Sequence, residues 1–186
     1  MANRSSSEPP GISAGVVLFV LVTALCGLAL GLAALLRLLF PPAALLLLAL
    51  ALPLVILISV SFGGPNYAKG RLGAFDMSQF EELAVIAAGL LCSPFLFGAL
   101  CREIFLLRLL AFQNAGSAGY SAWIGFGFDN LFEAVLLDIP ALYSLHSSPI
   151  RAVSFWSASL VLLYRLAVDL VLLKLLIQQA RHRKRI

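Results

Sequence analysis

The stretch that decides the fold is ISAGVVLFVLVTALCGLALGLAALL, residues 12–36, which contains no charged side chain. At a rise of about 1.5 Å per residue, a helix of this length crosses about 30 Å of hydrocarbon. A secretory signal peptide has an apolar region of only about 7–15 residues, so the stretch is too long for that interpretation. We therefore expect a retained membrane-spanning helix near the N-terminus.

Three further apolar stretches continue this pattern along the chain. Two of them carry no charge, and the last is interrupted by three charged side chains. The pair Pro41–Pro42 separates the first two stretches and predicts a tight antiparallel hairpin, because proline cannot continue a helix interior. Four membrane spans are therefore expected, at about residues 12–36, 43–62, 83–101 and 155–177.

The composition of the whole chain also indicates a membrane protein. Of its 186 residues, 61% are hydrophobic and 12% are charged, whereas soluble domains carry about 25% charged residues. The mean hydropathy is +1.00, and charge this sparse cannot cover a water-soluble surface. The length suits one domain, so we expect an all-α integral membrane protein with a single four-helix membrane domain over residues 12–180.

The segment between the third and fourth spans is expected to stay near the membrane surface. Residues 113–130 are rich in glycine, serine and aromatic residues, which is typical of a loop. Asn130 and Glu133 resemble the start of a capped helix, and apolar residues then recur at helical spacing up to Pro140. We predict one short interfacial amphipathic helix over about residues 131–145, either lying in the interface or re-entrant.

The basic residues are distributed unequally over the two sides of a four-span protein. The polar tail 1–11, the loop after the second span and the basic tail 181–186 share one side, with seven Lys and Arg against four opposite. The positive-inside rule then places both termini in the cytoplasm, in a plasma or inner membrane. We expect a topology anchor that can contact anionic lipid, and no nucleic-acid partner, from the cluster Arg181, Arg183, Lys184 and Arg185.

Arg165 and Asp169 are the most unusual residues of the predicted spans, because they place two charges four residues apart on one helix face. A lone charge at bilayer depth costs at least about 2.5–3.5 kcal/mol. We therefore predict an intramembrane charge pair that faces protein. Two interpretations stay open, a clamp between helices and a pathway for an ion, a proton or a substrate.

A second group of charges is expected to dock the interfacial helix onto the end of the third span. The end of the third span carries two arginines and a glutamate, and the interfacial segment carries acidic side chains, so that ion pairs can join them. A carboxylate pair for acid–base chemistry is the other interpretation, but no nucleophile or substrate pocket is predicted beside it. The residues of this interfacial group are Arg102, Glu103, Arg108, Asp129, Glu133 and Asp138.

The first span carries a row of small residues, Ala24, Gly27, Gly31 and Ala34. The step from Gly27 to Gly31 is a Gly-x-x-x-Gly pattern, which lets two helix backbones approach closely in a membrane. The row therefore predicts a helix-packing face, either within the chain or between chains.

No set of residues typical of an enzyme or a cofactor site is present. Cys26, Cys92 and Cys101 form no C-x-x-C pair, and neither histidine falls in a predicted span. We therefore predict a non-enzymatic protein without a cofactor, which acts as an interaction or scaffold subunit of a homo-oligomer or a larger membrane complex. The alternative hypothesis is a small oligomeric ion-conducting or transport module with Arg165 and Asp169 near the pathway.

Overall fold

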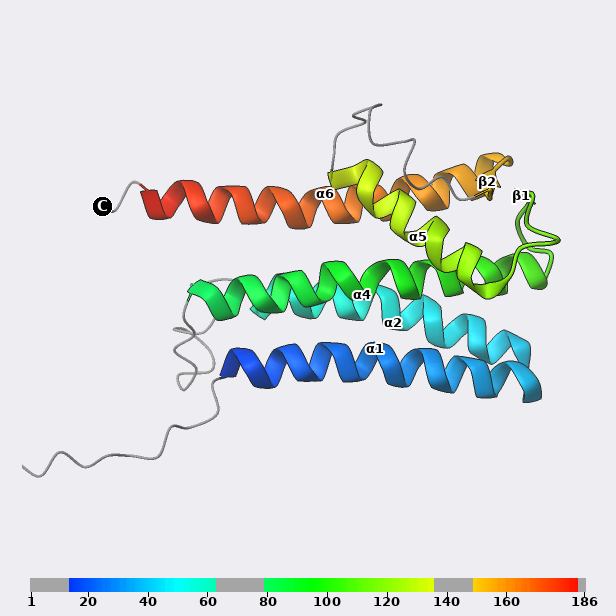
Figure 1. Cartoon of the computed structure of the whole chain (residues 1–186), viewed down its shortest axis with the longest axis horizontal. Helices are drawn as coiled ribbons and strands as arrows, with labels where there is room; N and C mark the ends of the chain where they lie inside the picture. The colour runs from blue at the N-terminus through cyan, green and yellow to red at the C-terminus, as the bar shows by residue number, and fades with distance from the viewer. Residues whose placement is uncertain (1–13, 63–78, 136–148, 184–186) are drawn as a thin grey trace, which may run out of the picture.

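The described part of the chain folds almost wholly into helices. The structure is a computed structural model that describes residues 14–62, 79–135 and 149–183. The two short strands pair antiparallel, and the all-α class is confirmed. The elements in chain order (Figure 1) are α1 (Ala14–Leu39), α2 (Pro41–Phe62), α4 (Gln79–Leu106), β1 (Phe112–Gln113), α5 (Tyr120–Val135), β2 (Arg151–Ala152) and α6 (Phe155–Arg183).

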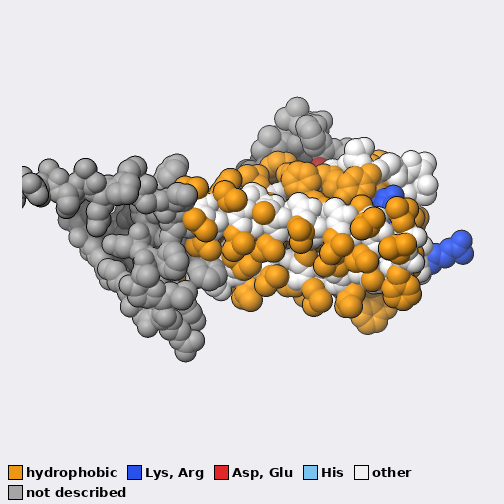
Figure 2. Space-filling model, turned by 90° about the horizontal axis from the view of Figure 1, so that it is seen from below, with side chains coloured by type: hydrophobic (Ala, Val, Ile, Leu, Met, Phe, Trp, Pro, Cys, Tyr) orange, Lys and Arg blue, Asp and Glu red, His pale blue; other side chains and the backbone are white. Residues whose placement is uncertain are grey.

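Three of these helices are long and apolar enough to cross a membrane. They contain the segments Gly15–Leu39, Pro41–Ser61 and Leu83–Leu106, which agree with the first three predicted spans. Figure 2 shows hydrophobic side chains spread over the described surface in that view, with basic side chains near one end only. Exposed apolar area on this scale indicates a membrane protein. α6 is not among these three helices, so the fourth crossing remains a proposal.

The ends of two helices have local causes in the sequence. Pro41 begins α2 instead of lying in a turn, because a proline in the first helical position removes only an N–H that would have no intrahelical partner. At the start of α6, the Ser157 N–H donates to Ser154 Oγ (3.1 Å) and the Ser154 N–H donates to Ser157 Oγ (3.0 Å). This reciprocal cap explains why α6 begins at the predicted residue, Phe155.

α1, α2 and α4 pack into a three-helix bundle, with α1 and α2 antiparallel (Figure 1). The core between them is made of fully buried aliphatic side chains, among them Val22 of α1, Leu48 and Val55 of α2, and Ala88 of α4. Lipid is as apolar as these side chains, so close packing rather than water exclusion stabilises such a bundle in a bilayer.

α5 corrects the predicted secondary structure of the connecting segment. The chain is already helical from Tyr120, within the region that was predicted to be a loop. The reason is packing: a Cβ on Gly98 of α4 would overlap the carbonyl oxygen of Trp123, and a Cβ on Gly127 of α5 would overlap that of Pro94. Two glycines thus allow α4 and α5 to touch backbone to backbone. Of the predicted interfacial helix, only its first residues fall in α5, and residues 136–148 lie outside the described residues.

The helix ends gather at two ends of the bundle. The first residues of α1 and α4 and the last residues of α6 lie at one end, on the left in Figure 1. The junction of α1 and α2, the two strands and the first residues of α5 and α6 lie at the other end. The first residues of α1 and the last described residues of α6 therefore lie at the same end of the bundle.

Candidate functional site

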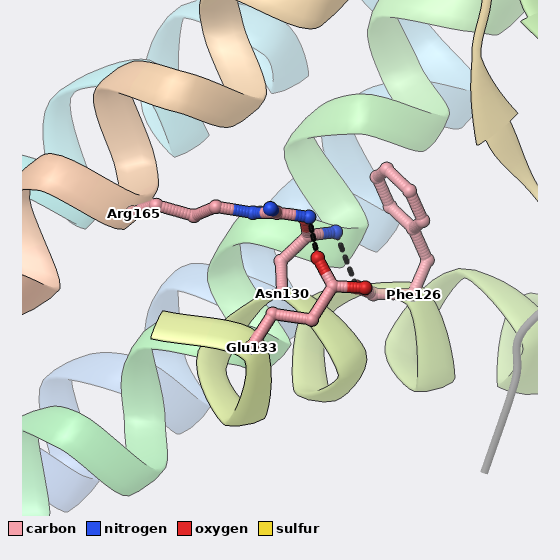
Figure 3. A network of polar contacts seen from close by, with 4 residues as sticks. All are labelled: Phe126, Asn130, Glu133 and Arg165. Carbon is pink, nitrogen blue, oxygen red and sulfur yellow. Dashed lines mark hydrogen bonds and ion pairs between the residues drawn. The ribbon is translucent and has the colours of Figure 1, made fainter. Parts of the chain in front are cut away.

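The most polar contact between helices in the described region joins α5 to α6 (Figure 3). Arg165 of α6 donates from Nε and Nη2 to Asn130 Oδ1, at 3.0 and 2.8 Å, and its Nη2 forms an ion pair with Glu133 Oε2. The Asn130 amide in turn donates from Nδ2 to the carbonyl oxygen of Phe126 at 2.8 Å. We call Phe126, Asn130, Glu133 and Arg165 the α5–α6 network.

The geometry of the α5–α6 network follows from helix spacing. Asn130 and Glu133 are three residues apart on α5, so they lie on the same face and both reach Arg165. The bond from Asn130 Nδ2 to Phe126 fixes the side-chain amide with its oxygen toward the guanidinium. Asn130 is only 3% exposed, while the side chains of Arg165 and Glu133 keep 33% and 21% exposure. The network is therefore a partly buried, charge-assisted tie between two helices.

Arg165 interacts electrostatically with Asp169, its predicted partner, and also with polar groups of α5. Arg165 does face polar partners on a neighbouring helix, but its ion pair is with Glu133. Asp169 is exposed, and no salt bridge joins it to Arg165 in the described structure. α5 presents two acceptors to the guanidinium, Asn130 Oδ1 and Glu133 Oε2, which together allow several charge-assisted bonds.

A second polar contact ties α6 to α4 one residue earlier. The hydroxyl groups of Ser93 and Tyr164 lie 2.9 Å apart in a buried position. The ring of Tyr164 stacks on Phe97, with centroids 4.0 Å apart and planes 5° from parallel. No sequence pattern singles out Ser93, Tyr164 or Phe97. Asn130, predicted to lie at the start of a helix, lies inside α5.

The interfacial group of charges forms a different set of pairs from the predicted one. Glu103 is 5% exposed, and its Oε1 lies 3.2 Å from Arg102 Nη1 and 3.7 Å from Arg37 Nε of α1. Arg102 also stacks over Tyr120, 5.3 Å from the ring centroid. Partial burial raises the pKa of Tyr120, against the opposing effect of Arg102. This cluster joins α4 to α1 through Arg37, which was not among the predicted interfacial charges.

The remaining members of the interfacial group are spread out. Glu133 belongs to the α5–α6 network, and Asp129 lies on the same helix. Arg108 is exposed just after α4, with a left-handed φ of 56°. Asp138 lies outside the described residues. The described partner of Glu133 is thus Arg165 of α6, and not an arginine at the end of α4.

The other predicted residues have clear positions. The small-residue row of α1 points outward: Ala24, Gly27, Gly31 and Ala34 are all exposed. The thiols of Cys26, Cys92 and Cys101 are buried and free. Of the basic tail, Arg181 and Arg183 belong to the last turn of α6, and Lys184 and Arg185 lie outside the described residues.

The chemistry available at these contacts is that of helix association. Within residues 14–62, 79–135 and 149–183, no group of three or more His, Cys, Asp or Glu side chains is placed to hold a metal ion. The polar side chains of α4, α5 and α6 bond to one another across helix interfaces. Comparison of the chain with protein-family models, with curated proteins and with solved structures finds no match.

Proposed function

We propose that this protein is a non-enzymatic subunit of a membrane assembly, which crosses the bilayer four times and uses outward helix faces to bind other membrane helices. The assembly is a homo-oligomer or a larger membrane complex. In this proposal both termini are cytoplasmic, the membrane is a plasma or inner membrane, and the basic tail contacts anionic lipid.

The observation that carries the proposal is the direction in which α1 packs. A Cβ on Gly27 or Gly31 would meet no atom within 4 Å. The residues of α1 that pack against α2 and α4 are others, including Val22, Cys26 and Ala29. A row of small residues gains little from lipid, whereas against a second helix it permits close backbone contact. The row is therefore best suited to a contact between chains.

The α5–α6 network favours a contact that holds two helices together over a pathway for an ion, a proton or a substrate. A residue that conducts an ion or a proton needs polar groups that continue along a route. Arg165 instead has Nε and Nη2 bonded to Asn130 and Glu133 on the adjacent helix. The network is suited to holding α6 in place, which is what an interaction subunit requires.

The test is the mass of the assembled protein in mild detergent and in lipid nanodiscs, measured by light scattering. We expect wild type to exceed the 19.9 kDa of one chain. Gly27→Leu and Gly31→Leu should shift the protein toward a single chain, because the new side chains hold the backbones apart. Leu28→Ala is the control, since Leu28 is 68% exposed beside the row and its loss should leave the assembly unchanged.

Two results would contradict the proposal. One is a wild-type protein that is a single chain in both media, or equal masses for all variants. The other is ion flux in liposomes that exceeds that of empty liposomes and disappears in Arg165→Leu, which would support conduction instead.

A further inference from the structure

A row of exposed side chains runs along the outward face of α6. The helix buries Val161, Tyr164 and Val168 against its neighbours. On another side, exposed residues recur at alternating spacings of four and three, which is the spacing of the seam between two coiled helices. We call this set the α6 row, and it consists of Leu162, Leu166, Asp169, Leu173 and Leu176.

Asp169 is the polar member of the α6 row. Its side chain is exposed, and it belongs to none of the salt bridges of the described structure. Arg165, one turn earlier, interacts with it electrostatically but gives its ion pair to Glu133. A charge that faces hydrocarbon is costly unless a partner covers it. A helix that packs on the α6 row therefore needs apolar side chains opposite the leucines and one polar, preferably cationic, side chain opposite Asp169.

We propose that the α6 row binds a membrane helix of a different protein, which presents aliphatic or small residues to the four leucines and a lysine or arginine to Asp169. This inference rests on the proposed function, because it requires α6 to cross the bilayer. The partner is identified by its charge: an acid inside an apolar seam selects a basic residue and rejects an acidic one.

A second copy of this chain fits the α6 row less well. Two copies in one membrane have the same orientation, so a symmetric contact through this row would place Asp169 opposite Asp169. Like charges at such a contact repel each other. Arg165 cannot easily relieve this repulsion, because its Nε and Nη2 already bond to Asn130 and Glu133. Self-association is therefore assigned to α1, and the α6 row to another protein.

The experiment uses the full-length protein in lipid vesicles and three synthetic membrane-spanning peptides. The peptides share a leucine–alanine sequence and carry lysine, leucine or aspartate at the central seam position. Energy transfer between labelled peptide and labelled protein measures their association. We expect wild type to bind the lysine peptide about tenfold more tightly than the leucine peptide. Asp169→Leu should lose this preference, and Leu163→Ala, a change at an exposed position outside the α6 row, should keep it.

The outcomes separate this inference from the proposed function. Equal binding of the lysine peptide to wild type and to Asp169→Leu would overturn it. Self-association of wild type that is lost in Asp169→Leu would also overturn it, by assigning the α6 row to a second copy. Neither result changes the masses measured for Gly27→Leu and Gly31→Leu, which test the contact through α1 alone.

Discussion

Removing one member of the Arg165–Glu133 pair should destabilise the protein more than removing both. Glu133→Leu leaves Arg165 with the Asn130 oxygen, at 2.8 and 3.0 Å, as its remaining hydrogen-bond acceptor. Arg165→Leu leaves the Glu133 carboxylate without its cation and the Asn130 oxygen without its donors. The double variant leaves no unpaired charge at the interface between α5 and α6.

The loss of stability in each variant depends on the polar groups that remain without a partner at the interface between α5 and α6. Breaking a fully buried ion pair costs about 3–5 kcal/mol, but these side chains keep 33% and 21% exposure. We therefore expect Glu133→Leu to lower the free energy of unfolding by about 2–3 kcal/mol. Arg165→Leu should cost about 1 kcal/mol more, because Asn130 is nearly buried and its oxygen loses two hydrogen bonds. The double variant should recover about half of the larger loss.

Equilibrium unfolding in mixed micelles, followed by tryptophan fluorescence, measures these differences. Trp123 is 1% exposed within α5 and reports on the packing of that helix. The matched control is Asp169→Leu, the same kind of change one turn further along α6. Because Asp169 is exposed and belongs to none of the salt bridges of the described structure, this variant should lower the free energy of unfolding by no more than about 0.5 kcal/mol.

Two results would refute the reasoning. If Glu133→Leu and Arg165→Leu are as stable as Asp169→Leu, the pair lies in water or among headgroups and does not hold α6. If the loss in the double variant equals the sum of the two single losses, the residues are not energetically coupled, and the ion pair contributes nothing.

Three further predictions concern packing, backbone strain and orientation. Gly127→Ala should destabilise α5 by at least about 1–3 kcal/mol because its Cβ meets the Pro94 backbone, whereas Gly125→Ala, with open space around it, should be neutral or stabilising in the same unfolding assay. Arg108→Gly should raise stability by about 0.5–1 kcal/mol and Arg108→Ala should not, since only glycine is relaxed at a φ of 56°. Cysteines at positions 5 and 184 should resist an impermeant thiol reagent added outside intact cells, and labelling of either would place that terminus outside.

The membrane class and three spans could be predicted because uninterrupted apolar length is a strong and local signal. The start of α6 could also be predicted, since a serine cap needs only neighbouring residues. α5 could not. Glycine costs about 1 kcal/mol in a helix relative to alanine, so Gly125 and Gly127 favoured a loop. Only the backbone of α4 beside them explains why one of these positions has to be a glycine.

The partner of Arg165 was beyond the sequence for a similar reason. The spacing of three or four residues identifies side chains that can meet within one helix, and it predicts Asp169 as the partner of Arg165. The observed hydrogen-bond acceptor, Asn130, is 35 residues away in the chain. Whether a side chain binds within its helix or across to another depends on how the helix is rotated in the bundle, and that rotation is set by packing.

The rotation of α6 is the property on which the proposed contacts depend. The described part of α5 has 16 residues, a length of about 24 Å, and it lies against α4 and α6. Tyr164 and Arg165 are adjacent, yet one binds Ser93 of α4 and the other binds α5. These two contacts, made by neighbouring residues with two different helices, restrict the rotation of α6 about its own axis. Together with the buried side chains of Val161 and Val168, these two contacts place Asp169 on the outward side of α6.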